Sequence, residues 1–269
     1  MQKIAQELNL SETVFLLPAT SPGCAAQARI FTPTVEMRFA GHPTLGASFV
    51  LVDEGAVPPG ATGFCLEEKI GRVPIRVERG ERDLFWLTTP PIHFGSTVDP
   101  AVCAQVLGVA ATDLLDLAPQ VVTAGNPCLF IAVKDKAAVD RSFVDMGGYR
   151  RLPVCEEGPL CVFVFAPTPS GAYSRMFAPE HGVVEDPATG SATGPLAAFM
   201  MKHRLIPLSA GTRMVSEQGT KMGRKSLLHV LVRGEGGGNG IEVGGHVTAL
   251  VEAKMTLPTA SRGPRSSTA

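Results

Sequence analysis

The sequence contains no long hydrophobic run and no excess of charge of one sign. No stretch reaches the roughly 18 apolar residues of a transmembrane helix, and the first residues lack the apolar region of a signal peptide. The 24 basic and 25 acidic side chains give a formal charge of −1, without a long basic run. These absences argue against a nucleic-acid or membrane partner. We therefore expect a cytoplasmic protein.

Cysteine is present, but without the spacing of a disulfide framework or a zinc site. The chain has no C-x-x-C pair, and its cysteines and histidines do not cluster at metal-ligand spacing. We expect reduced, mostly buried thiols, and neither a metal nor another cofactor. The six cysteines are Cys24, Cys65, Cys103, Cys128, Cys155 and Cys161.

Three common ligand or nucleophile motifs are also missing. The glycine-rich residues 234–239 lack the third glycine of a dinucleotide-binding motif and precede a predicted strand, so they indicate a hairpin loop. Residues 219–226 resemble a phosphate-binding loop, but Arg224 occupies the place of its second glycine. No G-x-S-x-G sequence is present, which excludes a typical serine-hydrolase nucleophile turn.

The apolar pattern predicts helices and short strands in two halves of similar plan. We assign residues 1–115 to an N-terminal lobe, 116–257 to a C-terminal lobe and 258–269 to a disordered tail rich in Ser, Thr, Pro, Gly and Arg. Helices are predicted at 1–8, 43–53, 100–107, 111–115, 137–144 and 191–203. Strands are predicted at 14–17, 26–31, 64–67, 73–78, 84–88, 120–123, 129–133, 161–165, 174–177, 213–216, 227–232, 241–243 and 247–252.

The most informative stretch is 182–195, where two acids and a proline precede small residues and an apolar helix. Pro187 disfavours helical dihedral angles at Asp186, so we expect the acids in a loop. Thr189 or Ser191 could cap the helix, and Gly190 would let a ligand approach the backbone. The free N–H groups of such a helix start form an anion site. The alternative is a capped helix after a surface turn.

A similar module occurs in the first half. Residues 41–44 (Gly-His-Pro-Thr) and 190–193 (Gly-Ser-Ala-Thr) each follow a turn with an acid and precede an apolar helix. This similarity suggests an internal duplication, with two helix N-termini facing one ligand in a pocket between the halves.

Several blocks of the sequence resemble the phenazine-biosynthesis PhzF-like family. The resemblance implies an α+β, diaminopimelate-epimerase-like fold, with two pseudo-repeated lobes that each wrap a curved mixed sheet around a central helix. The ligand would bind between the lobes. The matching blocks are N-L-S-E-T at 9–13, F-T-P at 31–33 with Glu36, A-G-H-P-T-L-G at 40–46, V-E-D-P-A-T-G-S-A at 184–192, and E-Q-G at 217–219 with M-G-R at 222–224.

The resemblance also implies roles for individual residues. It makes Glu12 the acid/base group, with His42, Asp186 and Ser191 as its catalytic partners. The substrate carboxylate would bind the N–H groups around Gly41–His42 and Gly190–Ser191. Without the resemblance, Glu12 would be interpreted as a solvated acid, and His42 as a residue that begins a helix.

Related racemases of this fold use two cysteines, at positions that correspond here to Ala40 and Thr189. Neither side chain can form a thiolate, so carboxylate and imidazole chemistry is expected instead. We expect a cofactor-independent isomerase in which Glu12 moves a proton on a small carboxylate-bearing substrate. The alternatives are a non-catalytic small-acid-binding relative and an epimerase of another amino or keto acid. The helices would also permit a homodimer.

The start of the chain departs from the family pattern. Family members place a strand and a Gly-Asn-Pro segment before the first helix, whereas this sequence begins within that helix. The second half does contain Gly-Asn-Pro, at 125–127. We therefore expect about thirty residues of the first lobe to be absent and a neighbouring strand to lack a partner. Either the start codon lies upstream or the chain is a truncated relative.

Overall fold

A computed structural model describes residues 1–156, 158–207, 209–234 and 240–256. The described residues form a 15-stranded mixed sheet. In sheet order its strands are β1 (Thr13–Leu17), β2 (Ala26–Phe31), β4 (Gly63–Glu68), β5 (Gly71–Glu78), β6 (Leu84–Thr88), β15 (Ile241–His246), β14 (Ser226–Val232), β13 (Arg213–Gln218), β11 (Gly171–Ala178), β10 (Cys161–Thr168), β9 (Pro127–Ala132), β8 (Gln120–Thr123) and β7 (His93–Thr97), with β3 (Glu36–Met37) beside β2 and β12 (Val183–Asp186) beside β11.

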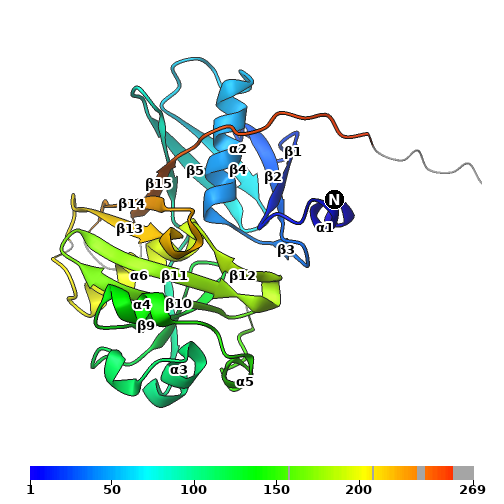
Figure 1. Cartoon of the computed structure of the whole chain (residues 1–269). Coiled ribbons are helices and arrows are strands. Elements are labelled where there is room, and N and C mark those ends of the chain that lie inside the picture. Colours follow the sequence, from blue (N-terminus) through cyan, green and yellow to red (C-terminus); the bar gives the residue numbers. More distant parts are fainter. Residues whose placement is uncertain (157, 208, 235–239, 257–269) are drawn as a thin grey trace, which may run out of the picture.

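The sheet forms two lobes, each with one long helix (Figure 1). The two central helices are 13 residues each, and α6 is buried along most of its length because the sheet surrounds it. One apolar cluster includes Leu45 and Leu51 of α2 together with Leu196 and Phe199 of α6, so the lobes share a core. The helices are α1 (Gln2–Leu8), α2 (Gly41–Asp53), α3 (Pro100–Leu107), α4 (Lys136–Arg141), α5 (Met146–Tyr149) and α6 (Gly190–Lys202), with 3₁₀ turns at Ala111–Asp113, Pro179–His181 and Thr220–Met222. No helix in these residues is long and apolar enough to span a membrane.

The internal repeat is visible in matching side-chain pairs. Arg29 Nε contacts Glu36 Oε1 at 2.8 Å and joins β2 to β3, while Arg175 Nε contacts Glu185 Oε1 at 2.8 Å and joins β11 to β12. Each glutamate lies five residues before the first glycine of a central helix. The repeat therefore extends from the helix starts to the strands that lead into them.

Strands from the two halves of the sequence pair with each other. β15, the last strand, pairs with β6, and β7 pairs with β8. α3 packs in the second apolar cluster together with residues of β8, β9 and β10. The division at residue 115 stays a prediction, and β1 lies at one end of the described sheet.

Most of the elements expected from the sequence are present, with three corrections. Asp186 was expected in a loop, but it is the last residue of β12 because it pairs with Met176 of β11. The strand expected at 247–252 does not form, since no neighbouring strand pairs with this exposed segment. β3, β7 and α5 were not predicted. The predicted hairpin joins β14 to β15, but 235–239 and the predicted tail from 258 lie outside the described residues.

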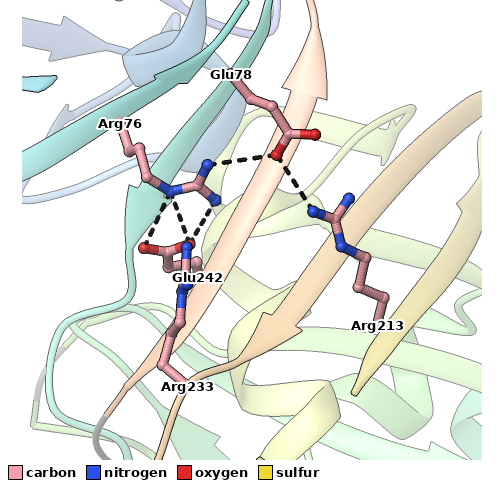
Figure 2. Close-up of polar contacts among 5 residues, drawn as sticks. All are labelled: Arg76, Glu78, Arg213, Arg233 and Glu242. Carbon is pink, nitrogen blue, oxygen red and sulfur yellow. Dashed lines mark hydrogen bonds and ion pairs between the residues drawn. The ribbon is translucent and has the colours of Figure 1, made fainter. Parts of the chain in front are cut away.

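A cluster of charged side chains links β5, β13 and β15 (Figure 2). Glu242 of β15 accepts hydrogen bonds from Arg76 of β5, at 2.7 Å from Nη2, and from Arg233. Arg76 and Arg213 also contact Glu78 at 3.3 Å each. Glu242 has 13% of its side chain exposed and Glu78 has 41%, so we expect Glu242 to contribute more to stability.

Glu242→Gln should lower the free energy of unfolding by about 1.5–3 kcal/mol, because the charged hydrogen bonds to Arg76 would be lost in a half-buried site. Glu78→Gln is the matched control and should cost less than about 1 kcal/mol, as for exposed ion pairs. Urea unfolding of both variants measures the difference. Equal losses would contradict the expected dominance of Glu242.

Candidate active site

The two central helices meet end to end at a pair of glycines. A Cβ atom built on Gly41 would lie 2.3 Å from Gly190 Cα, and one built on Gly190 would lie 2.9 Å from Gly41 Cα. Only glycine permits this approach of two backbones. Gly190 makes room for the other helix, and its expected role in letting a ligand approach stays a prediction.

Neither of these helix starts has a side-chain cap. The N-cap residues are Ala40 and Thr189, and neither forms a capping hydrogen bond. The Thr189 hydroxyl, which was expected as a possible cap, instead donates to Asp186 Oδ2 at 2.6 Å. The first N–H groups of each helix have no partner within the helix, so two positive helix ends converge at one place.

Glu12 and His42 form an ion pair beside this point. Glu12 lies in the turn between α1 and β1, and the left-handed conformation of Asn9 (φ 49°) ends the helix just before it. Its Oε2 lies 3.0 Å from His42 Nε2, with 11% of the Glu12 side chain exposed. Burial by itself would lower the pKa of His42, but the charges of Glu12 and Asp186 raise it to about 9. His42 is therefore a cation at neutral pH, and it balances the Glu12 carboxylate.

Asp186 completes the charged group from the opposite lobe. It is 3% exposed, and its Oδ1 has no hydrogen-bond partner among the described residues. Burial raises the pKa of Asp186, with His42 acting in the opposite direction. Ligand atoms of Glu12, His42 and Asp186 all lie within 4.8 Å of one another. This spacing would also suit a divalent cation, and the effect of a chelator on activity tests for one.

Two amide side chains hold the site together. Gln218, at the end of β13, accepts from Thr189 N–H at 3.1 Å and donates to Thr189 Oγ1 at 2.8 Å and to the Asp186 carbonyl at 2.7 Å. Asn126 donates to the Phe39 carbonyl at 2.6 Å and thereby ties the second lobe to the segment that leads into α2. Both residues belong to motifs noted in the sequence, E-Q-G and Gly-Asn-Pro, but their partners were not predictable.

All six predicted site residues line one cavity of about 30 Å³ between the lobes. They are Glu12, Gly41, His42, Asp186, Gly190 and Ser191. The cavity wall also includes Cys128, Cys161 and His181, which sequence reasoning missed. Cys128 and Cys161 lie in register on the neighbouring strands β9 and β10. No motif identified them, because only the parallel pairing of these strands brings them together.

The sequence matches a family model described as phenazine biosynthesis-like protein over residues 1–253. Trans-2,3-dihydro-3-hydroxyanthranilate isomerase from Pseudomonas aeruginosa is 36% identical, with 96% of this chain and 88% of the relative aligned. A predicted epimerase from the same organism has a structure that matches with a TM-score of 0.78 at 31% identity, covering 96% of this chain and 88% of the other. A probable proline racemase from Agrobacterium radiobacter shares the fold, with a TM-score of 0.63 at 14% identity over 96% and 81% of the chains. These matches confirm the expected α+β, diaminopimelate-epimerase-like fold.

Gly41→Ala should lower the free energy of unfolding by about 1–3 kcal/mol, because the new methyl group would meet the Gly190 backbone. Gly46→Ala, five residues further along α2, is the control, since a Cβ there meets nothing within 4 Å. The control should be neutral or raise stability by up to about 1 kcal/mol, as expected for alanine in a helix. Thermal unfolding of both variants measures this. A destabilised Gly46→Ala with an unchanged Gly41→Ala would disprove the backbone contact.

The His42 imidazole should titrate near pH 9, as measured by NMR of its ring protons. In Glu12→Gln the pKa of His42 should fall, because the charge that raises it is removed while burial, which lowers it, remains. Glu7→Gln changes an exposed acid on α1 and should leave this titration unchanged. An unaltered His42 pKa in Glu12→Gln would refute the assigned pairing.

Proposed function

The chain belongs to the phenazine biosynthesis-like family of isomerases, and we propose that it moves a proton on a small carboxylate-bearing substrate in the cleft between the lobes. The supporting observation is the convergence of two uncapped helix starts beside the Glu12–His42 ion pair and the buried Asp186. The helix ends would bind the substrate carboxylate, and the ionised Glu12 would be the base.

The proton shift needs two steps at Glu12. Its carboxylate removes a proton from a carbon next to an unsaturated bond, and the electron pair left on that carbon is delocalised into the bond. The protonated Glu12 then returns the proton to another carbon on the same face of the substrate. His42 and Asp186 would orient the substrate and balance charge, and Ser191 would donate a hydrogen bond.

Positively charged His42 suits the first step. The His42 imidazolium lies 3.0 Å from the Glu12 carboxylate and pairs with it before the substrate binds. Once Glu12 takes the proton, the cation can stabilise the negative charge that develops on the substrate.

The geometry of the same site is less suited to a racemisation by two thiols. Ala40 and Thr189 occupy equivalent N-cap positions of α2 and α6, and neither has a thiol. The two cavity cysteines both come from the second lobe, on β9 and β10. They therefore cannot face each other across the cleft as one thiol from each lobe would.

The test is deuterium uptake from D₂O into a panel of small unsaturated acids and amino acids, beginning with the named substrate of the relative, trans-2,3-dihydro-3-hydroxyanthranilate. Glu12→Gln should reduce exchange by about 10²–10⁴-fold, with folding and ligand affinity nearly unchanged. Glu7→Gln should exchange like the native chain, and a chelator should have no effect.

Full exchange in Glu12→Gln would refute the glutamate mechanism. If Cys161→Ser abolished exchange while Glu12→Gln did not, thiol chemistry would replace it. Tight binding of an acid without any exchange in the native chain would instead support a non-catalytic binding protein.

A further inference from the structure

A second buried glutamate lies beneath the first turn of α2, outside the cavity. Glu68 is the last residue of β4 and is 5% exposed. Its Oε1 lies 2.5 Å from Thr44 Oγ1, whereas its Oε2 is buried without a hydrogen-bond partner among the described residues. Thr44 lies two residues after His42, so Glu68 contacts the turn that presents the imidazole.

A count of protons shows which form of Glu68 fits this arrangement. Thr44 Oγ1 lies 2.5 Å from the Ala40 carbonyl oxygen and 2.5 Å from Glu68 Oε1. A hydroxyl has one proton to donate, so an ionised Glu68 would leave one of these oxygen pairs without a hydrogen. A neutral Glu68 supplies the missing proton, because its carboxyl donates to Thr44 and Thr44 donates to Ala40.

The second lobe provides a comparison within the same molecule. Gln218 ends β13 as Glu68 ends β4, and Thr193 donates to the Thr189 carbonyl at 2.9 Å as Thr44 donates to that of Ala40. Gln218 reaches the start of α6 with an amide, which donates to Thr189 Oγ1. A protonated carboxylic acid and a primary amide both offer a donor and an acceptor from one planar group.

Six charged side chains of β4, the residue after it and the neighbouring β2, β5 and α2 have partners other than Glu68. They are His42, which pairs with Glu12, Arg29 and Lys69, which pair with Glu36, Glu67, which bonds to Thr20, Arg72, which bonds to the Pro22 carbonyl, and Arg76, which pairs with Glu242. Burial therefore dominates and raises the pKa of Glu68 to about 8. Hydrogen bonds from Thr44 and the Ala40 backbone to the ionised carboxylate would act in the opposite direction.

We propose that Glu68 is held as a neutral acid that donates a hydrogen bond to Thr44 and thereby positions the first turn of α2 and His42. Glu68 is not among the residues that line the cavity, so it would act as a positioning residue. Its protonation links the geometry of the site to pH: above the pKa of Glu68, the ionised carboxylate leaves Thr44 with two acceptors and one proton.

The sign of the effect on stability follows from the pKa of Glu68, which is ordinarily 4.5 and is raised to about 8 in the folded chain. The contribution of the neutral acid is complete below pH 4.5 and is lost as the pH rises through 8. Glu68→Gln keeps a donor and removes the titration. The ratio of the folding constants of the native chain and Glu68→Gln should therefore fall by up to about tenfold per pH unit between pH 5 and 8.

Glu67→Gln is the matched control for this experiment. The bonds from Thr20 and Ser21 lower the pKa of Glu67 to about 2, so its titration lies outside this range and the variant should keep the slope of the native chain. Parallel pH profiles of the native chain and Glu68→Gln would overturn the proposal. Failure of Glu68→Gln to fold at pH 7 would do the same, because the amide is expected to replace the neutral acid.

The effect on His42 is tested by exchange activity, and this arm rests on the proposed function. Glu68→Ala should reduce deuterium exchange roughly 10- to 100-fold through misplacement of His42, and Glu68→Gln should restore it to within about twofold. Equal impairment in both variants would overturn the positioning role. The stability comparison needs no substrate, so failure of the isomerase assignment is distinguishable from failure of the neutral-acid assignment.

Discussion

The contact between Gly41 and Gly190 determines the geometry of the whole site. Two helices from different lobes can meet at their first residues only because neither residue has a side chain at the contact. That contact brings two uncapped helix starts together, sets the position of His42 and places Asp186 opposite Glu12. Packing and the proposed catalysis thus depend on the same two glycines.

The two lobes use one plan with different chemistry at equivalent positions. His42 in α2 corresponds to Ser191 in α6, and Glu68 at the end of β4 corresponds to Gln218 at the end of β13. Of the three titratable residues that meet at the site, Glu12 and His42 come from the first lobe and Asp186 from the second.

Local sequence predicted the helices other than α5, most strands and the paired modules at 41–44 and 190–193, because periodicity and helix-start residues are local properties. Glu12 required the family resemblance, since an acid after a helix is usually solvated. Asn126 and Cys161 could not be placed at the site, because their positions depend on strand pairing between distant segments. The predicted strand at 247–252 does not form for the same reason, because a strand needs a partner that local sequence does not specify.

The pairing of β15 with β6 also affects the order in which the chain can fold. Thr88 pairs with Glu242, so the sheet of the first lobe is completed by β15, which lies far along the chain. On a ribosome, which releases the N-terminal part first, β6 emerges long before this neighbour. The edge of β6 therefore stays unpaired, and Arg76 lacks its Glu242 partner, until β15 has been synthesised.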